Sequence, residues 1–78
     1  MVHPREVFKV AILSNSASII IAHNHPSGLV EPSIDDIQVT ETLIRAGEIM
    51  GIDVLDHIIV GGSNNYRSIR EMGIVEGM

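Results

Sequence analysis

Two apolar runs, separated by one segment of helix length, constrain the fold of this chain more than any other feature. The first run, Ser18 to Ala22, is short and rich in isoleucine, and the second extends from Ile52 to Val60. Runs of this kind are typical of strands that are buried on both faces of a sheet. The order strand, helix, strand implies two parallel strands joined by a right-handed crossover. The sequence therefore predicts an α/β fold.

Capping and turn signals set the expected bounds of the elements. Ser33 precedes an apolar pattern with helical spacing and Gly51 follows it, as at the two ends of a helix. The stripe expected to face the core of this helix consists of Val39, Leu43, Ala46 and Met50. In chain order we expect a helix over 5–13, a stop over 14–16, a strand over 18–22, a helix over 33–50, a strand over 52–60, a glycine-rich turn over 61–65, a short strand over 66–69 and a helical turn over 70–72.

The expected sheet is small, with two or three mostly buried strands and two main helices in a single domain over residues 1–78. A chain of 78 residues buries only about 60–65% of the surface that it exposes when unfolded. Cysteine is absent, so no disulfide can stabilise the domain. A bound metal ion or a partner chain would have to supply the extra stability. A sheet this small also has open edges. We therefore expect strands to be supplied by a longer protein or by a second copy, and we predict a homo-oligomer through the sheet edges.

Charge and hydropathy exclude some partners. The net charge is −5, and the basic residues are scattered along the chain, whereas nucleic-acid binding usually needs clustered positive charge. No apolar run approaches the ~20 residues that span a bilayer, and the N-terminus lacks the apolar core of a signal peptide. We expect a cytoplasmic protein that binds neither DNA directly nor a membrane. The five basic residues are Arg5, Lys9, Arg45, Arg67 and Arg70.

The segment AHNHPSG, residues 22–28, carries the chemistry. On a strand, residues i and i+2 point the same way, so His23 and His25 can chelate a borderline metal such as Zn²⁺. If the following turn swings the start of the next helix back over the histidines, Asp36 becomes the third ligand. This set leaves an open position for water, and Ser33 could donate a hydrogen bond to a developing oxyanion.

Structural roles explain the same residues without a metal. His23 and His25 could simply be polar residues that close a strand. Ser33 and Asp36 nearly match a capping box, in which two side chains accept hydrogen bonds from free backbone N–H groups at a helix N-terminus. Asp56 and His57 are neighbours on the second strand and point to opposite faces, so we expect a buried hydrogen-bonded pair rather than a chelate.

The spacing of these residues resembles the signature of the JAMM/MPN⁺ (JAB) metalloprotease superfamily. The longer string HPREVF…AHNHPSG…PSIDDI…LDHIIVGG…YRSIRE resembles its bacterial RadC-like branch over nearly the whole chain, from His3 to about Val75. The resemblance implies a partial cytidine-deaminase-like α/β sandwich. It implies zinc held by His23, His25 and Asp36, with Ser33 as the oxyanion stabiliser. The implied activity is water-mediated hydrolysis of a peptide or isopeptide bond in a peptide or protein substrate, in a family once named for DNA repair.

One departure concerns the general base. The superfamily pattern places a glutamate on an early strand upstream of the first helix, and the segment that would carry it is missing from this sequence. Glu6 is the only acid before the histidines, and it lies in the first turn of the expected helix, which is the wrong element. We therefore expect a truncated domain with Glu6 as its only candidate base, weakly active or inactive. The alternative is a non-catalytic, self-associating binding or assembly module.

Overall fold

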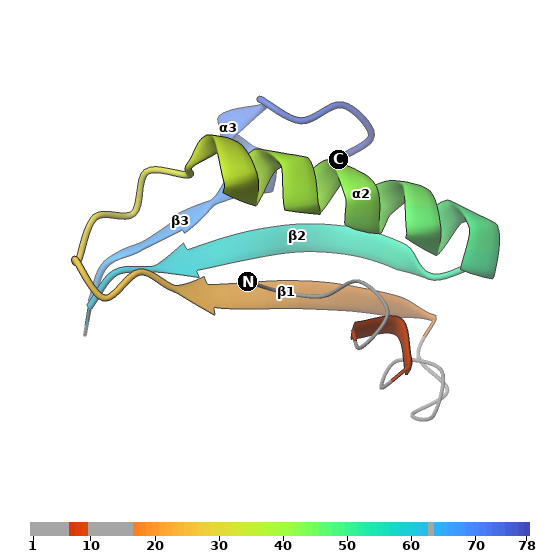
Figure 1. The fold of residues 1–78 in the computed structure, drawn as a ribbon, viewed down its shortest axis with the longest axis horizontal. Coiled ribbons are helices and arrows are strands. Elements are labelled where there is room, and N and C mark those ends of the chain that lie inside the picture. Colours follow the sequence, from red (N-terminus) through yellow and green to blue (C-terminus); the bar gives the residue numbers. More distant parts are fainter. Residues whose placement is uncertain (1–6, 10–16, 63) are drawn as a thin grey trace.

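The computed structural model describes residues 7–9, 17–62 and 64–78 (Figure 1). It confirms a small α/β fold with the expected order of elements. The predicted helix over 5–13 is described only at residues 7–9, which are helical; its other residues and the stop over 14–16 lie outside the described residues. The elements are β1 (Ser18–Asn24), α2 (Ile34–Met50), β2 (Asp53–Val60), β3 (Tyr66–Ser68) and α3 (Ile69–Met72).

The sheet has three strands in the order β1-β2-β3. Strands β1 and β2 are parallel, as predicted, whereas β3 pairs antiparallel with β2, so the sheet is mixed. The β1–β2 register shifts between Ile19 and Ile20, where Leu55 has no partner. Beyond this shift, His23 lies opposite Ile59 and Asn24 opposite Val60. This register places the carboxyl ends of both parallel strands at the same end of the sheet.

Helices α2 and α3 pack on the same face of the sheet. Ile59 of β2 is fully buried in a cluster with Ile69 of α3 and Val75, and Ile37 and Ile44 of α2 pack against it. A second cluster lies toward the other end of α2 and contains Phe8, Ile21, Leu43, Ile52 and Val54. Together these clusters fix α2 across the sheet, with its N-terminus near the carboxyl end of β1 (Figure 1).

The prediction that the two apolar strands are buried on both faces is wrong. Burial alternates along β1, where Ile21 is buried and Ile20 is 62% exposed. In β2, Val54 is buried and the adjacent Leu55 is 40% exposed. The reason is that the helices within the described ranges cover one face of the sheet, which leaves the other face open. Association through the open edges stays a prediction. No helix among the described residues has both the length and the apolar character needed to cross a membrane.

The deepest positions of α2 also differ from the predicted apolar stripe. Of that stripe, Leu43 is buried, Val39 and Ala46 pack partly against the core, and Met50 is 49% exposed. The hydrophobic pattern of the sequence did not identify the buried face of α2, because half of the residues on that face are polar. The buried residues are Asp36, Thr40, Leu43 and Gly47.

Candidate metal centre

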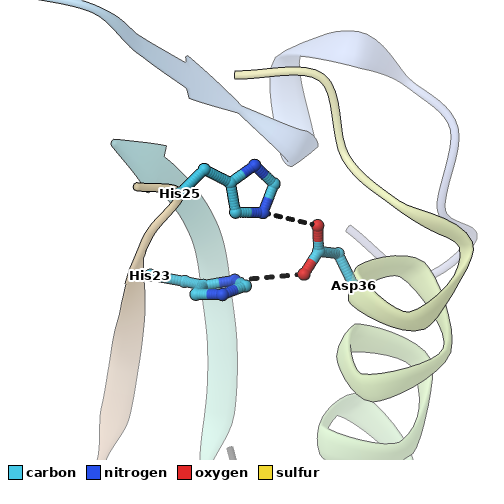
Figure 2. A group of neighbouring side chains, drawn as sticks. All are labelled: His23, His25 and Asp36. Carbon is cyan, nitrogen blue, oxygen red and sulfur yellow. Dashed lines mark ion pairs between the residues drawn. The ribbon is translucent and has the colours of Figure 1, made fainter. Parts of the chain in front are cut away.

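His23, His25 and Asp36 converge at the carboxyl end of β1. His23 Nδ1 lies 3.0 Å from Asp36 Oδ1, and His25 Nε2 lies 3.0 Å from Asp36 Oδ2 (Figure 2). Both histidines are half-buried, and Asp36 is 5% exposed. The structure therefore brings together the three residues that the sequence singled out, with the two neighbouring imidazoles each facing a different oxygen of one carboxylate.

A tight turn after β1 makes this convergence possible. The Gly28 N–H donates to the carbonyl of His25 at 3.0 Å, so the chain reverses over residues 25–28. Gly28 has φ +85°, a left-handed conformation that other residues rarely adopt. The loop then returns to α2, whose first turn lies over the histidines.

A capping box orients the carboxylate. The Ser33 backbone N–H donates to Asp36 Oδ2 at 2.8 Å, and the Asp36 backbone N–H donates to Ser33 Oγ at 3.1 Å. The predicted capping role is therefore present in the structure. The same carboxylate also faces both imidazoles, so its role in the cap does not turn it away from the histidines. The Ser33 hydroxyl accepts in this box, which leaves its own proton available for donation toward the site.

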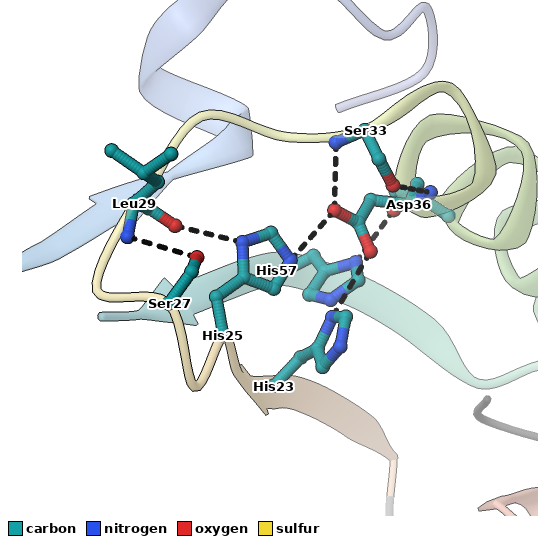
Figure 3. Close-up of polar contacts among 8 residues, drawn as sticks. His23, His25, Ser27, Leu29, Ser33, Asp36 and His57 are labelled. Carbon is teal, nitrogen blue, oxygen red and sulfur yellow. Dashed lines mark hydrogen bonds and ion pairs between the residues drawn. The ribbon is translucent and has the colours of Figure 1, made fainter. Parts of the chain in front are cut away.

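The hydrogen bond made by His25 Nδ1 fixes the chemistry of its other nitrogen. His25 Nδ1 lies 2.8 Å from the Leu29 carbonyl oxygen (Figure 3). Because a carbonyl only accepts, Nδ1 must carry the hydrogen, and Nε2 of the neutral ring is then a bare lone pair. This lone pair faces Asp36 Oδ2, another acceptor. The pair is favourable only with a cation between them, either a proton or a metal ion.

The donor set fits a metal ion. Two ligands on a tetrahedral zinc, each about 2.0–2.2 Å from the ion, lie about 3.3 Å apart. The observed N–O separations of 3.0 Å are close to this edge, and the three ligand atoms all lie within 4.8 Å of one another. They border a cavity of about 260 Å³, large enough for water and a substrate group. The cavity is also lined by Ser33, Asp35, Val39 and His57.

Asp36 is held as an anion. Burial raises the pKa of its carboxyl, but hydrogen bonds from Ser33 and the attraction of His23 and His25 in their protonated forms outweigh burial, so the pKa lies below its usual range. A buried carboxylate that stays ionised is a strong ligand for a divalent cation.

Thr40 and His57 form a second buried layer that the sequence did not reveal as part of the site. The Thr40 hydroxyl donates to the Asp36 carbonyl at 2.7 Å, and His57 Nδ1 lies 2.6 Å from the same hydroxyl oxygen. Thr40 and His57 are 0% and 1% exposed. Burial lowers the pKa of His57, so its ring is held neutral. The one available signal was spacing, because Thr40 follows Asp36 by four residues and shares its helix face.

Asp56 and His57 are hydrogen-bonded to each other, as expected, but through the His57 backbone and not through its ring. The His57 backbone N–H donates to Asp56 Oδ1, but the imidazole turns to Thr40. Asp56 instead accepts from the Ser68 hydroxyl at 2.5 Å and from the Arg70 backbone N–H at 3.1 Å. The sequence did not indicate these partners, because Thr40, Ser68 and Arg70 reach the two side chains only through tertiary packing. The other candidate, Glu6, lies outside the described residues.

A small α/β domain in which two imidazoles and a carboxylate border one cavity is a candidate metal-dependent domain, and comparison with known proteins agrees. A family model described as the RadC-like JAB domain matches residues 1–74. UPF0758 proteins of Methanosarcina acetivorans and Desulforamulus reducens are 56% and 57% identical over 75 residues, which is 96% of this chain and 32% and 33% of theirs. A UPF0758 protein of Symbiobacterium thermophilum is 51% identical over 77 residues, 99% of this chain and 32% of its own length.

The chain belongs to the RadC-like JAB domain family, which confirms the resemblance seen in its sequence. It spans about a third of the length of these curated relatives.

Proposed function

We propose that this chain binds one zinc ion through His23, His25 and Asp36, and that the site belongs to a metallohydrolase acting on peptide or isopeptide bonds. Family membership suggests metal use in general terms. The observation that carries the proposal is the facing of two acceptors, His25 Nε2 and Asp36 Oδ2, at 3.0 Å. A divalent cation between them satisfies both.

Each residue has a defined task. His23 and His25 supply neutral donors, and Asp36 supplies one negative charge, so a divalent ion keeps a net charge near +1. When bound, zinc lowers the pKa of a coordinated water to about 7 and polarises a carbonyl at the open position. Ser33 keeps a hydroxyl proton that can stabilise negative charge on the substrate oxygen. The Leu29 carbonyl holds the ring of His25 in the productive tautomer.

The isolated chain is expected to hydrolyse slowly at most. Among the described residues that line the cavity, Asp35 is the one acid besides Asp36, and it lies exposed in the first turn of α2. Missing general-base catalysis typically costs 10²–10⁴-fold in rate. Rapid, chelator-sensitive cleavage of peptides by this 78-residue chain would contradict this expectation.

The test is calorimetric titration of the chelator-treated chain with zinc. We expect one zinc per wild-type chain. Asp36→Asn should lose more than the ~10–100-fold in affinity that removing a supporting hydrogen bond costs. Asparagine can still accept the bond from the Ser33 N–H, so circular dichroism should show an intact helix. Asp35→Asn is the matched control because it removes the same charge one residue away and should bind zinc as the wild type does.

Two outcomes would overturn the proposal. A wild-type chain that takes up no zinc would show that the cation between His25 and Asp36 is a proton. Equal affinity in Asp36→Asn and Asp35→Asn would show that zinc binds elsewhere.

A further inference from the structure

We propose that Thr40 and His57 are positioning residues for Asp36, acting through a buried hydrogen-bonded chain that ties β2 to the first turns of α2. This inference rests on the proposed metal site. The chain runs from the His57 ring to the Thr40 hydroxyl and from that hydroxyl to the Asp36 backbone carbonyl.

The direction of each hydrogen bond follows from the atoms involved. The Asp36 carbonyl only accepts, so the single hydroxyl proton of Thr40 is donated to it at 2.7 Å. The Thr40 oxygen must then accept from His57, whose Nδ1 carries the hydrogen, at 2.6 Å. The whole chain has one arrangement, and it cannot reverse without losing a bond.

His57 contacts both elements that supply the proposed ligands. It lies on β2 opposite Ile21 of β1, and its ring centroid is 5.9 Å from that of His23 (Figure 3). Through Thr40 it also holds the backbone of Asp36. The same side chain therefore sets the position of α2 relative to the strand that carries His23 and His25.

Burying a ring nitrogen without a partner costs stability, and this cost argues that His57 has a geometric role. His57 Nε2 is buried and has no hydrogen-bond partner among the described residues. An apolar side chain of similar size would bury no unpartnered nitrogen and would pack against α2 at least as well. What an apolar residue cannot do is hold the Asp36 carbonyl in one orientation through Thr40.

The test compares Thr40→Val, which keeps the shape but removes the hydroxyl, with Thr40→Ser, which keeps the hydroxyl. Affinity for Co²⁺ and the visible absorption spectrum of the cobalt-loaded chain report ligand geometry without any activity assay. We expect Thr40→Val to bind about 10–100-fold more weakly, with an altered spectrum, as for other residues that support a metal ligand. Thr40→Ser should match the wild type in both measurements.

Leu43→Ala is the control for general destabilisation, because Leu43 is equally buried on the same helix face. It should lower the melting temperature while leaving the cobalt spectrum of the folded chain unchanged. His57→Asn provides a second comparison, since its amide nitrogen can replace Nδ1 as the donor to Thr40, whereas the longer His57→Gln cannot. We expect Asn at this position to retain more cobalt affinity than Gln.

Several results would overturn the inference. Wild-type affinity and spectrum in Thr40→Val would show that the hydroxyl chain does not position Asp36. An altered cobalt spectrum in Leu43→Ala would show that any loss of core packing disturbs the site. Equal losses in His57→Asn and His57→Gln would show that a donor at the position of Nδ1 does not matter, and a smaller loss in His57→Gln would point to Nε2. By contrast, a wild-type chain that binds neither cobalt nor zinc would overturn the proposed function itself, and with it this inference.

Discussion

The two halves of α2 bury different chemistry on the same helix face. The N-terminal half buries Asp36 and Thr40, whose polar groups all meet specific partners at the carboxyl end of the sheet. The C-terminal half buries Leu43 and Gly47 against an apolar cluster that includes Phe8. The spacing of these four residues is that of one continuous stripe.

The difference shows how a small domain combines a site with a core. Burying a leucine contributes roughly 1.5–3 kcal/mol to stability without demanding an exact orientation. A buried polar group contributes little net stability, but its hydrogen bonds have direction and fix geometry. The C-terminal half therefore holds α2 on the sheet, and the N-terminal half sets the angle at which Asp36 meets the histidines.

Leu43→Ala should have the largest effect on folding. Leu43 is fully buried, and such truncations cost about 2–5 kcal/mol of the free energy of unfolding. Urea denaturation measures the loss. Leu43→Met, which conserves volume, should cost under about 1.5 kcal/mol. If Leu43→Ala were as stable as the wild type, the apolar half would not be what holds α2 in place.

Gly47→Ala should also destabilise the apolar half, although alanine is the better helix former by about 1 kcal/mol. A Cβ at this position would lie 2.2 Å from the Ile52 carbonyl oxygen, and overpacking of this kind costs about 1–3 kcal/mol. Thermal unfolding measures the change. The neighbouring exposed Glu48→Ala is the control and should change little. A Gly47→Ala chain more stable than the wild type would contradict the close packing of this helix end.

Ser33→Ala should have a moderate effect on stability, about 1 kcal/mol, because it removes the N-cap acceptor of α2. Zinc affinity should change little, since the bond from the Ser33 backbone N–H to Asp36 remains. Ser33→Gly has no side-chain proton to donate, yet glycine is tolerated at an N-cap, so it should cost only roughly a few tenths of a kcal/mol. If Ser33→Gly kept the residual hydrolysis of the wild type, Ser33 would act as a cap and not as an oxyanion donor.

Acidification should also lower stability, and it should act on the polar half. Burial lowers the pKa of His57, so below its ordinary value of 6.5 the unfolded chain binds the extra proton first, and stability falls as the pH falls. The lowered pKa of Asp36 acts in the same direction below 3.8. Denaturation of the metal-free chain at several pH values measures this. Asp36→Asn should flatten the most acidic part of the plot of stability against pH. An unchanged plot would show that Asp36 does not cause the loss of stability in acid.

The fold was largely predictable because its signals are local. Two β-branched runs around a capped helix imply parallel strands, and Ser33 and Gly51 mark the helix ends correctly. The exposure of Ile20 was not predictable from those runs, because it depends on which face the helices cover.

The site was predictable where its geometry is local to one element. The shared direction of His23 and His25 follows from the strand, whereas the position of Asp36 beside them depends on the turn after β1, which the sequence allowed but did not require. The layer formed by Thr40 and His57 was not predictable, because it joins residues 17 positions apart through tertiary packing. Hydrophobic periodicity also ignores polar residues, so it could not place Asp36 and Thr40 on the buried face.

X-ray absorption spectroscopy at the zinc edge of the loaded chain tests the central claim most directly. The account predicts two imidazole nitrogens at about 2.0–2.1 Å, with the remaining ligands oxygen at about 2.0–2.2 Å. A zinc environment of oxygen alone, or one with three or more imidazoles, would show that His23, His25 and Asp36 do not form the metal centre.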